Sequence, residues 1–378
     1  MIDTAPASGF LSVGQATARA IALRSAGSGR LQRTLLVHGP AGAGKDAFVD
    51  DLLALALCAD PDPGRRPCNA CAACRTARAR SHPDLVVGSP ERWRDGRSGG
   101  ESIVAAARRW LGESAGAPIA GELRVLLIDG VDRAGEPIQN ALLKALEEPT
   151  DRHMYILVAD DASALLPTIR SRSQPLRIGA VPHAELVAWL LDHHRLPRDQ
   201  AEALARVSGG MAGTALAYIG NSALLEWRRR TQSELLVMLD RGRADRFGSV
   251  RELLDWASRF RAEASAELAA DGVEASAEEA IRPTTSVQRE AAMLVADAWL
   301  DLARDLLLIG AGKGDLTPAA HLLSGQERVA EAIDPRALRA FVTVLRRVGD
   351  GLAQNASPRL GLEVAMLAWP RVPASSRR

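Results

Sequence analysis

The first half of the chain alternates short apolar runs with amphipathic helical segments. Between the first two runs, apolar residues recur at helical spacing, which predicts a helix over residues 45–57. Strands that alternate with helices are typical of a parallel α/β sheet, so we expect this fold class up to about residue 180. The expected buried strands are residues 34–38, 85–87, 124–128, 154–158 and 176–178.

The second half carries only helical patterns. A compact helical stretch is expected over residues 181–220 and longer helices over 221–378, with a sharp helix start at Asp334-Pro335. Glycine and proline predict a surface loop over 88–100, and a charged, weakly patterned segment predicts a loop or linker over 271–286. The fold class is therefore α/β followed by all-α.

Composition narrows the possible functions. The chain has 378 residues, enough for two or three domains, and 47 basic residues balance 46 acidic ones. This near-neutral charge disfavours an autonomous nucleic-acid-binding protein, which would show a basic excess. No apolar stretch reaches 18 residues, so we expect no membrane span and a cytoplasmic protein.

A phosphate-binding loop follows the first expected strand. Residues 39–46 read Gly-Pro-Ala-Gly-Ala-Gly-Lys-Asp, in which backbone N–H groups can cradle phosphates and the lysine can reach their outer oxygens. Asp46 stands where a serine or threonine would bind Mg²⁺. We expect the nucleotide-binding residues of this degenerate site to be Gly39, Gly42, Gly44, Lys45, Asp46 and Asp129.

Asp129 ends the third expected strand, where a Mg²⁺-orienting carboxylate belongs. The next residue is Gly130 instead of the glutamate that polarises water in active motors of this type, and Asp132 lies two residues further along. These departures predict no ATP hydrolysis. Nucleotide binding without turnover stays open, because Lys45 and the loop backbone are retained.

All four cysteines lie between residues 58 and 74. Cys58, Cys68, Cys71 and Cys74 have the spacing of a four-thiolate Zn²⁺ site, which leaves no open position and is therefore structural. Two disulfides or four free thiols are the alternatives, and a chain of this length with no apparent signal peptide disfavours disulfides. His82 is a less favoured substitute ligand.

Two further segments resemble a known family. Residues 139–149 read Gln-Asn-Ala-Leu-Leu-Lys-Ala-Leu-Glu-Glu-Pro, and residues 166–173 read Leu-Pro-Thr-Ile-Arg-Ser-Arg-Ser. Together with the cysteine knuckle, Ser81–Asp84 and the stretch 355–363, they make the chain similar to the delta-prime family of bacterial clamp-loader subunits. These are AAA+ proteins of the DNA polymerase III holoenzyme, a nucleotidyltransferase complex.

The resemblance implies an organisation and a role. Residues 1–180 would be the AAA+ module with its zinc knuckle (58–74), 181–220 a helical lid, and 221–378 a collar that assembles five subunits. Arg172 would be an arginine finger in a neighbouring subunit's ATP site. Gly213 occupies the position of a lid arginine that senses the γ-phosphate, so the chain's own site would be inactive.

The implied protein is a stator of the DNA polymerase III clamp loader at the nucleoid-associated replisome. Its partners would be gamma/tau and delta subunits in a heteropentamer, with the sliding clamp and primed DNA contacted through the complex and no membrane. The rival functions are the ATP-hydrolysing gamma/tau motor, a zinc-lid P-loop kinase and an autonomous zinc-dependent DNA-binding protein. From the residues alone, Arg172 could equally be a solvated charge at a helix end.

Overall fold

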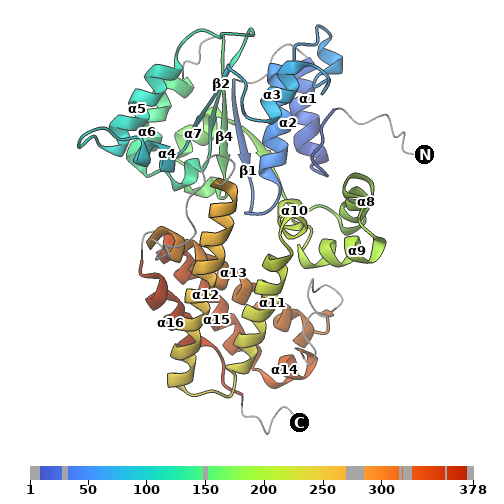
Figure 1. The fold of residues 1–378 in the computed structure, drawn as a ribbon, viewed down its shortest axis with the longest axis vertical. Coiled ribbons are helices and arrows are strands. Elements are labelled where there is room, and N and C mark those ends of the chain that lie inside the picture. The colour runs from blue at the N-terminus through green and yellow to red at the C-terminus, as the bar shows by residue number, and fades with distance from the viewer. Residues whose placement is uncertain are drawn as a thin grey trace. The chain divides into compact units, whose positions relative to one another are not determined.

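The computed structural model divides the chain into two compact units, Met1–Leu216 and Ala217–Arg378 (Figure 1). No described helix combines the length and apolar composition needed to cross a bilayer. The residues that the structure describes are 9–27, 33–147, 152–269, 285–314, 317, 326–353 and 356–372.

The first unit is built on a five-stranded sheet in the order β2-β3-β4-β1-β5, in which every pairing is parallel. The predicted parallel α/β class is confirmed, and each predicted apolar run contains or overlaps a strand. The strands are β1 (Thr34–His38), β2 (Leu85–Gly88), β3 (Arg124–Ile128), β4 (His153–Ala159) and β5 (Gln174–Arg177).

Strand β5 begins two residues before the predicted range of 176–178 and ends one residue before it. Its pairing with β1 begins at Gln174, opposite Leu35, and includes Pro175. Proline and polar residues are tolerated because β5 is an edge strand, with one side free of ladder hydrogen bonds. The apolar pattern therefore marked only the buried end of this strand.

Helices cover both faces of the sheet, as a parallel sheet requires (Figure 1). Alternate strand residues point to opposite faces, so Leu35 and Val37 join one core while Leu36 joins the other. One face packs against α1 (Ala16–Gly27), α2 (Lys45–Leu57) and α3 (Ala72–Arg78). The other packs against α4 (Pro90–Asp95), α5 (Ile103–Ser114), α6 (Glu136–Glu147) and α7 (Pro167–Arg172).

The loop predicted over 88–100 is wrong in its first half, where α4 forms. The Ser89 hydroxyl accepts a hydrogen bond from the N–H of Arg92, and Pro90 occupies the first turn, so the helix has a strong start. Trp93 is buried and packs against Trp110, which fixes α4 on α5. Residues 96–102 have no regular structure.

Three short helices follow the sheet: α8 (His183–His194), α9 (Arg198–Val207) and α10 (Ala212–Gly220). The last of these runs across the division between the units. A phosphate loop between β1 and α2 of this parallel sheet agrees with the AAA+ module that the resemblance implies.

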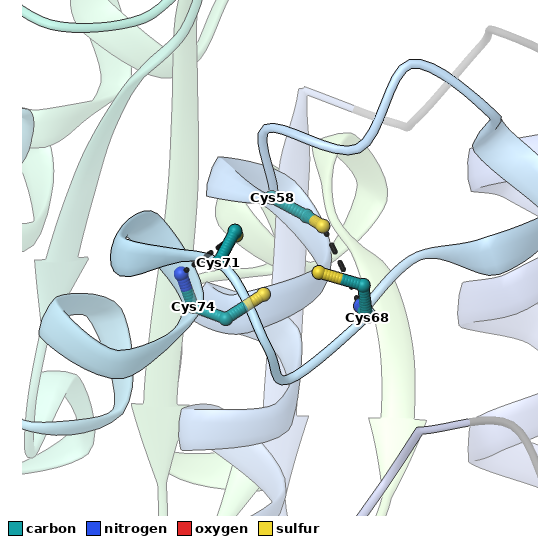
Figure 2. A group of neighbouring side chains, drawn as sticks. All are labelled: Cys58, Cys68, Cys71 and Cys74. Carbon is teal, nitrogen blue, oxygen red and sulfur yellow. Dashed lines mark hydrogen bonds between the residues drawn. The ribbon is translucent and has the colours of Figure 1, made fainter.

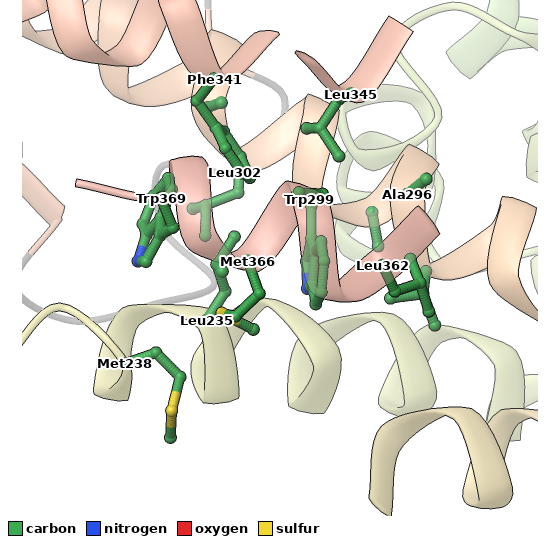
Figure 3. Close-up of a cluster of buried hydrophobic side chains, with 14 of the residues drawn as sticks. Leu235, Met238, Ala296, Trp299, Leu302, Phe341, Leu345, Leu362, Met366 and Trp369 are labelled. Carbon is green, nitrogen blue, oxygen red and sulfur yellow. The ribbon is translucent and has the colours of Figure 1, made fainter. Parts of the chain in front are cut away.

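The second unit is entirely helical in its described residues. Figure 3 shows its core, where Trp299 and Trp369 pack among leucines and methionines from several helices. The Asp334 carboxylate accepts the N–H of Arg336 at 2.8 Å, so the predicted helix start is confirmed. Residues 271–284 of the expected linker lie outside the described residues, and 285–286 begin α13. The helices are α11 (Ser222–Val237), α12 (Arg243–Ala269), α13 (Thr285–Gly310), α14 (Gln326–Ala332), α15 (Pro335–Ala353) and α16 (Pro358–Ala368).

Candidate nucleotide site, cysteine cluster and arginine helix

The phosphate loop lies at the carboxyl-terminal edge of the sheet, between β1 and α2. Gly39, Gly42 and Gly44 have φ angles of 148°, 76° and 94°, which L side chains rarely adopt. A Cβ at Gly39 would lie 1.8 Å from the carbonyl oxygen of Ile178. Glycine is therefore required here by backbone conformation and by close approach. Asp129 and Asp160 follow β3 and β4 at the same edge of the sheet.

Lys45 is held by acceptors of its own chain. Its Nζ atom lies 2.7 Å from the carbonyl oxygen of Gly39, 3.0 Å from that of Pro40 and 2.5 Å from Oδ1 of Asp160. An ammonium group has three N–H donors, and these contacts engage all of them. In this conformation Lys45 has no donor free for a phosphate, because one of its N–H groups is already bonded to the Asp160 carboxylate.

The start of α10 lies against the phosphate loop. The Thr214 N–H donates to the Gly42 carbonyl at 3.0 Å. A Cβ at Gly213 would lie 2.9 Å from that carbonyl oxygen and 3.1 Å from the amide nitrogen of Gly44. The start of α10 therefore lies directly on Gly42 and Gly44, whereas Pro40, Ala41 and Asp46 of the same loop are exposed. Because Lys45 is also engaged by its own chain, this conformation is not one that holds a nucleotide.

Asp46 is paired with an arginine that the sequence did not indicate. Nη2 of Arg80 lies 3.0 Å from Oδ1 of Asp46, and its Nε donates to Oδ1 of Asp50 at 2.8 Å. Burial raises the pKa of Asp129 and the charge of Asp46 raises it further, while the nearby charges of Arg133 and Arg80 oppose this rise. The carboxylates that would face a magnesium ion thus already have a cation of the chain beside them.

The position after Asp129 is covered as well. A Cβ at Gly130 would lie 2.2–2.7 Å from the guanidinium of Arg133, whose Nε is 3.2 Å from Oε1 of Glu91. Asp132 accepts the backbone N–H groups of Asp160 and Asp161 on one oxygen, at 2.9 and 3.0 Å. Asp132 therefore fastens the segment after β4 and does not replace the missing glutamate.

The four cysteines converge between the end of α2 and the start of α3 (Figure 2). Their sulfur atoms all lie within 4.8 Å of one another, and all four are free thiols. N–H groups of Asp60 and Cys68 point at Sγ of Cys58, each at 3.5 Å, and that of Cys74 points at Sγ of Cys71 at 3.3 Å. Four soft donors in this arrangement fit a tetrahedral metal ion.

Burial opposes ionisation of Cys71, but N–H groups of Ala59 and Cys74 outweigh it and lower its pKa to about 6. His82 is not among the residues that cluster here, and its Nδ1 accepts the N–H of Asp84 at 3.1 Å. Asp84 is fully buried and accepts the N–H groups of Ile119, Ala120 and Gly121. The Ser81–Asp84 stretch is thus a structural support beside the cysteines.

Arg172 is the last residue of α7 and is partly exposed. Its Nη2 lies 2.9 Å from Oε1 of Glu147 at the end of α6, and its Nη1 donates to the carbonyl of Thr168 at 3.2 Å. The following residue, Ser173, donates its hydroxyl to the carbonyl of Ile169 at 2.8 Å, which closes the helix end. Glu148 lies outside the described residues.

Comparison with known proteins bears on the first half of the chain. Residues 14–182 match the family model described as "DNA polymerase III, delta subunit". The subunit delta' of DNA polymerase III from Escherichia coli K12 is 30% identical over 190 residues, which are 50% of this chain and 55% of that protein. The same subunit from Pseudomonas aeruginosa is 34% identical over 199 residues, 51% and 58% of the two chains. Over this half, the chain is delta-prime-like.

The matches span about half the length of these delta-prime relatives. The gamma/tau subunit from Mycobacterium bovis is 26% identical over 163 residues, which are 43% of this chain and 27% of that protein. Among solved structures, a gamma subunit-related protein of DNA polymerase III from Thermotoga maritima is 16% identical, with a TM-score of 0.42 over 96% of this chain and 99% of that one. By sequence the delta-prime relatives match at higher identity and over a larger share of both chains than the gamma/tau relative does, so the delta-prime resemblance is the better supported of the two.

Proposed function

We propose that this chain is the delta-prime subunit of a DNA polymerase III clamp loader and acts there as a stator. It would help load the sliding clamp onto primed DNA and would supply Arg172 to a neighbouring subunit's ATP site. The delta-prime-like sequence of residues 14–182 supports this role. The observation that carries it is an asymmetry: at the chain's own phosphate loop Lys45 pairs with Asp160 and Asp46 with Arg80, whereas Arg172 is exposed at a helix end.

The chemistry of Arg172 suits a site in another chain. A guanidinium is planar and always charged, and it can donate several hydrogen bonds to phosphate oxygens. Placed beside a γ-phosphate, it would stabilise the charge that develops during transfer. Arg172 is far from its own phosphate loop in sequence, and in the described part of the first unit its guanidinium contacts Glu147 and Thr168.

The chain itself would not hydrolyse ATP. Asp46 removes the Mg²⁺-binding hydroxyl, Gly130 removes the base, and Gly213 removes the lid arginine. Nucleotide binding would require α10 to leave the loop and Lys45 to leave Asp160. A steady-state ATPase rate like that of the motor subunits, abolished by Lys45→Ala, would favour the gamma/tau motor instead.

The remaining parts of the proposal are a structural zinc and a set of partners. Cys58, Cys68, Cys71 and Cys74 would hold one Zn²⁺, whose four thiolates leave no position for water. The helical second unit would join gamma/tau and delta subunits in a heteropentamer, with clamp and DNA contacted through the assembly. A subunit with this role works in the cytoplasm, at the nucleoid-associated replisome.

The test is reconstitution with the gamma/tau and delta subunits of the same organism. We expect a defined pentamer with wild-type and with Arg172→Ala chain, and DNA- and clamp-stimulated ATPase that is slower with the variant. An arginine finger supplied in trans is worth about 10³-fold or more at its site, although intact sites mask part of this in the total rate. Failure to assemble, or equal ATPase and loading rates at matched assembly, would overturn the proposal.

A further inference from the structure

Helix α6 holds the arginine helix α7 at the point where α7 begins. Gln139 is 3% exposed, and its Nε2 donates to the carbonyls of Ala134 at 2.9 Å and Ala164 at 3.2 Å. Its Oε1 accepts the N–H of Leu166 at 2.8 Å, directly before α7. One buried amide therefore joins the segments that follow β3 and β4 to the start of α7.

The two helices also share an apolar core. Leu142 and Leu146 of α6 and Ile169 of α7 belong to one buried cluster beneath the sheet. Asp132, in the segment after β3, accepts two N–H groups of the segment after β4 and so also joins these two segments. The backbone of α7 is thus bound to the sheet through α6 and has little freedom to turn.

Glu147, two turns further along α6, contacts the side chain of Arg172. Its carboxylate takes Nη2 of Arg172, while the carbonyl of Thr168 takes Nη1. A guanidinium has five N–H donors, so these two contacts leave others for an incoming acceptor. The side chains of Arg172 and Glu147 are 38% and 45% exposed, and such pairs contribute at most about 1 kcal/mol to stability.

We infer that Gln139 and Glu147 are positioning residues for Arg172. Gln139 fixes the backbone of α7 against the sheet, and Glu147 orients the guanidinium before a neighbour's phosphate is present. The entropy of ordering a long side chain is then paid before the encounter instead of during the reaction. This inference rests on the proposed arginine-finger role, and it gives the α6 segment 139–147 a function within its own chain.

The test compares variants in the reconstituted clamp loader. Glu147→Gln keeps the size of the side chain but removes its charge, and Glu113→Gln is the matched control, a surface glutamate paired with Arg109 on α5. A misplacement of 1 Å can cost about 100-fold in rate, so we expect Glu147→Gln to lower kcat by about 3- to 30-fold at the affected site. KM for ATP should stay unchanged, and Glu147→Asp should restore part of the rate.

Two measurements separate positioning from a general structural effect. On the Arg172→Ala background, Glu147→Gln should cause no further loss, because the group that it orients is gone. Gln139→Ala should lower kcat more than Glu147→Gln does, in protein whose metal content and pentamer assembly match the wild type. If Gln139→Ala does not fold, the Glu147 series decides alone.

The outcomes distinguish a failure of the proposed function from a failure of the positioning role alone. If Arg172→Ala loads clamps at the wild-type rate, the proposed function and this inference both fall. If Arg172→Ala is slow but Glu147→Gln is as fast as Glu113→Gln or faster, the inference alone falls. A loss with Glu147→Gln that persists on the Arg172→Ala background would likewise overturn positioning.

Discussion

Lys45 and Asp46 are neighbours in sequence, and each is neutralised by a residue from a distant segment. Asp160, from the end of β4, supplies the anion for Lys45, and Arg80, from the end of α3, supplies the cation for Asp46. A magnesium nucleotide would bring the same two charges, an anionic phosphate for Lys45 and a cation for Asp46. The site is therefore electrostatically satisfied without a ligand, and a nucleotide must displace both contacts.

Replacing Asp160 with asparagine should increase nucleotide affinity. The change releases Lys45 and removes a negative charge that would repel phosphate. A unit charge at about 4 Å is worth on the order of 1 kcal/mol in water and more near a protein surface, so we expect at least about tenfold tighter binding. Titration with a fluorescent ATP analogue measures this, with Asp161→Asn as control. Equal affinities for Asp160→Asn and wild type would contradict the prediction.

The carboxylate of Asp84 should matter for stability in a pH-dependent way. Burial disfavours its charge, but the N–H groups of Ile119, Ala120 and Gly121 outweigh burial and hold its pKa below the ordinary value. A lowered folded-state pKa stabilises the fold above the unfolded-state pKa, and this contribution is lost as pH falls through the folded-state pKa.

Asp84→Asn should therefore lower the free energy of unfolding by about 2–4 kcal/mol at pH 7, since it breaks charge-assisted hydrogen bonds. The difference from wild type should shrink as the pH falls below about 4. Denaturant titrations at several pH values measure both effects. Asp95→Asn, an exposed position, should stay within about 0.5 kcal/mol of wild type. A pH-independent difference would show that the charge of Asp84 is not the cause.

At the scale of elements, the cysteine knuckle is tied to the phosphate-loop helix. Asp51 of α2 is fully buried and accepts hydrogen bonds from the N–H groups of Leu11 and Ser12. It also forms an ion pair with Arg78, whose Nη1 lies 2.7 Å from Oδ1 of Asp51. Arg78 of α3 also donates to the side chain of Asn69, between two of the cysteines. The metal site and α2 are thus parts of one connected structure.

Cys71→Ser should therefore destabilise the first unit and not only empty the metal site. We expect native mass spectrometry to find one zinc per wild-type chain and none in the variant. Structural zinc contributes about 10–16 kcal/mol in isolated zinc-finger peptides, so the loss here should reach several kcal/mol. Ala72→Ser, exposed on the same helix, is the control. Wild-type protein purified without chelator that carries no metal would contradict the zinc assignment.

Much of the fold could be predicted because its elements are local. The limits of β1, β3 and α2 agree with the apolar runs and the helical spacing. Helix α4 was missed because glycines further along outweighed the start signal at Ser89-Pro90. Strand β5 was displaced because pairing with β1, and not its own apolar residues, decides where it begins.

The candidate site was predictable only in part. The glycines, Lys45 and the four cysteines have fixed spacings that carry their chemistry, whereas Arg80 and Asp160 reach the loop through tertiary contacts. Lys45 and Asp160 are 115 residues apart, and no spacing connects them. Arg80 has a positive φ of 53°, and nothing in the sequence around it indicates that conformation.

At the scale of the whole molecule, each unit has its own core and its own buried polar anchor. In the second unit, Arg246 is 2% exposed and donates to the carbonyls of Met238, Met366, Trp369 and Pro370. It joins the start of α12 to the end of α11 and to the end of α16. Removing this side chain takes a donor from each of the four carbonyls, of which those of Met238 and Met366 keep a backbone N–H donor, from Arg241 and Trp369.

We expect two thermal transitions in calorimetry of the full chain, because the buried clusters of the first unit share no residue with that of the second. Cys71→Ser should lower the transition of the first unit and leave the other in place. Arg246→Met should lower only the second, by about 2–4 kcal/mol for the loss of its charge-assisted hydrogen bonds to backbone carbonyls. A single transition that both variants shift equally would show that the units unfold together.

The strand order also sets a delay during synthesis. Strand β1 is complete at His38, but its two neighbours, β4 and β5, begin at His153 and Gln174. At about 5–20 residues per second, the ribosome needs on the order of 10 s to make the intervening chain. For that time an apolar strand has both edges unpaired, which favours aggregation. A nascent chain of this length is therefore expected to depend on chaperones before its first unit can close.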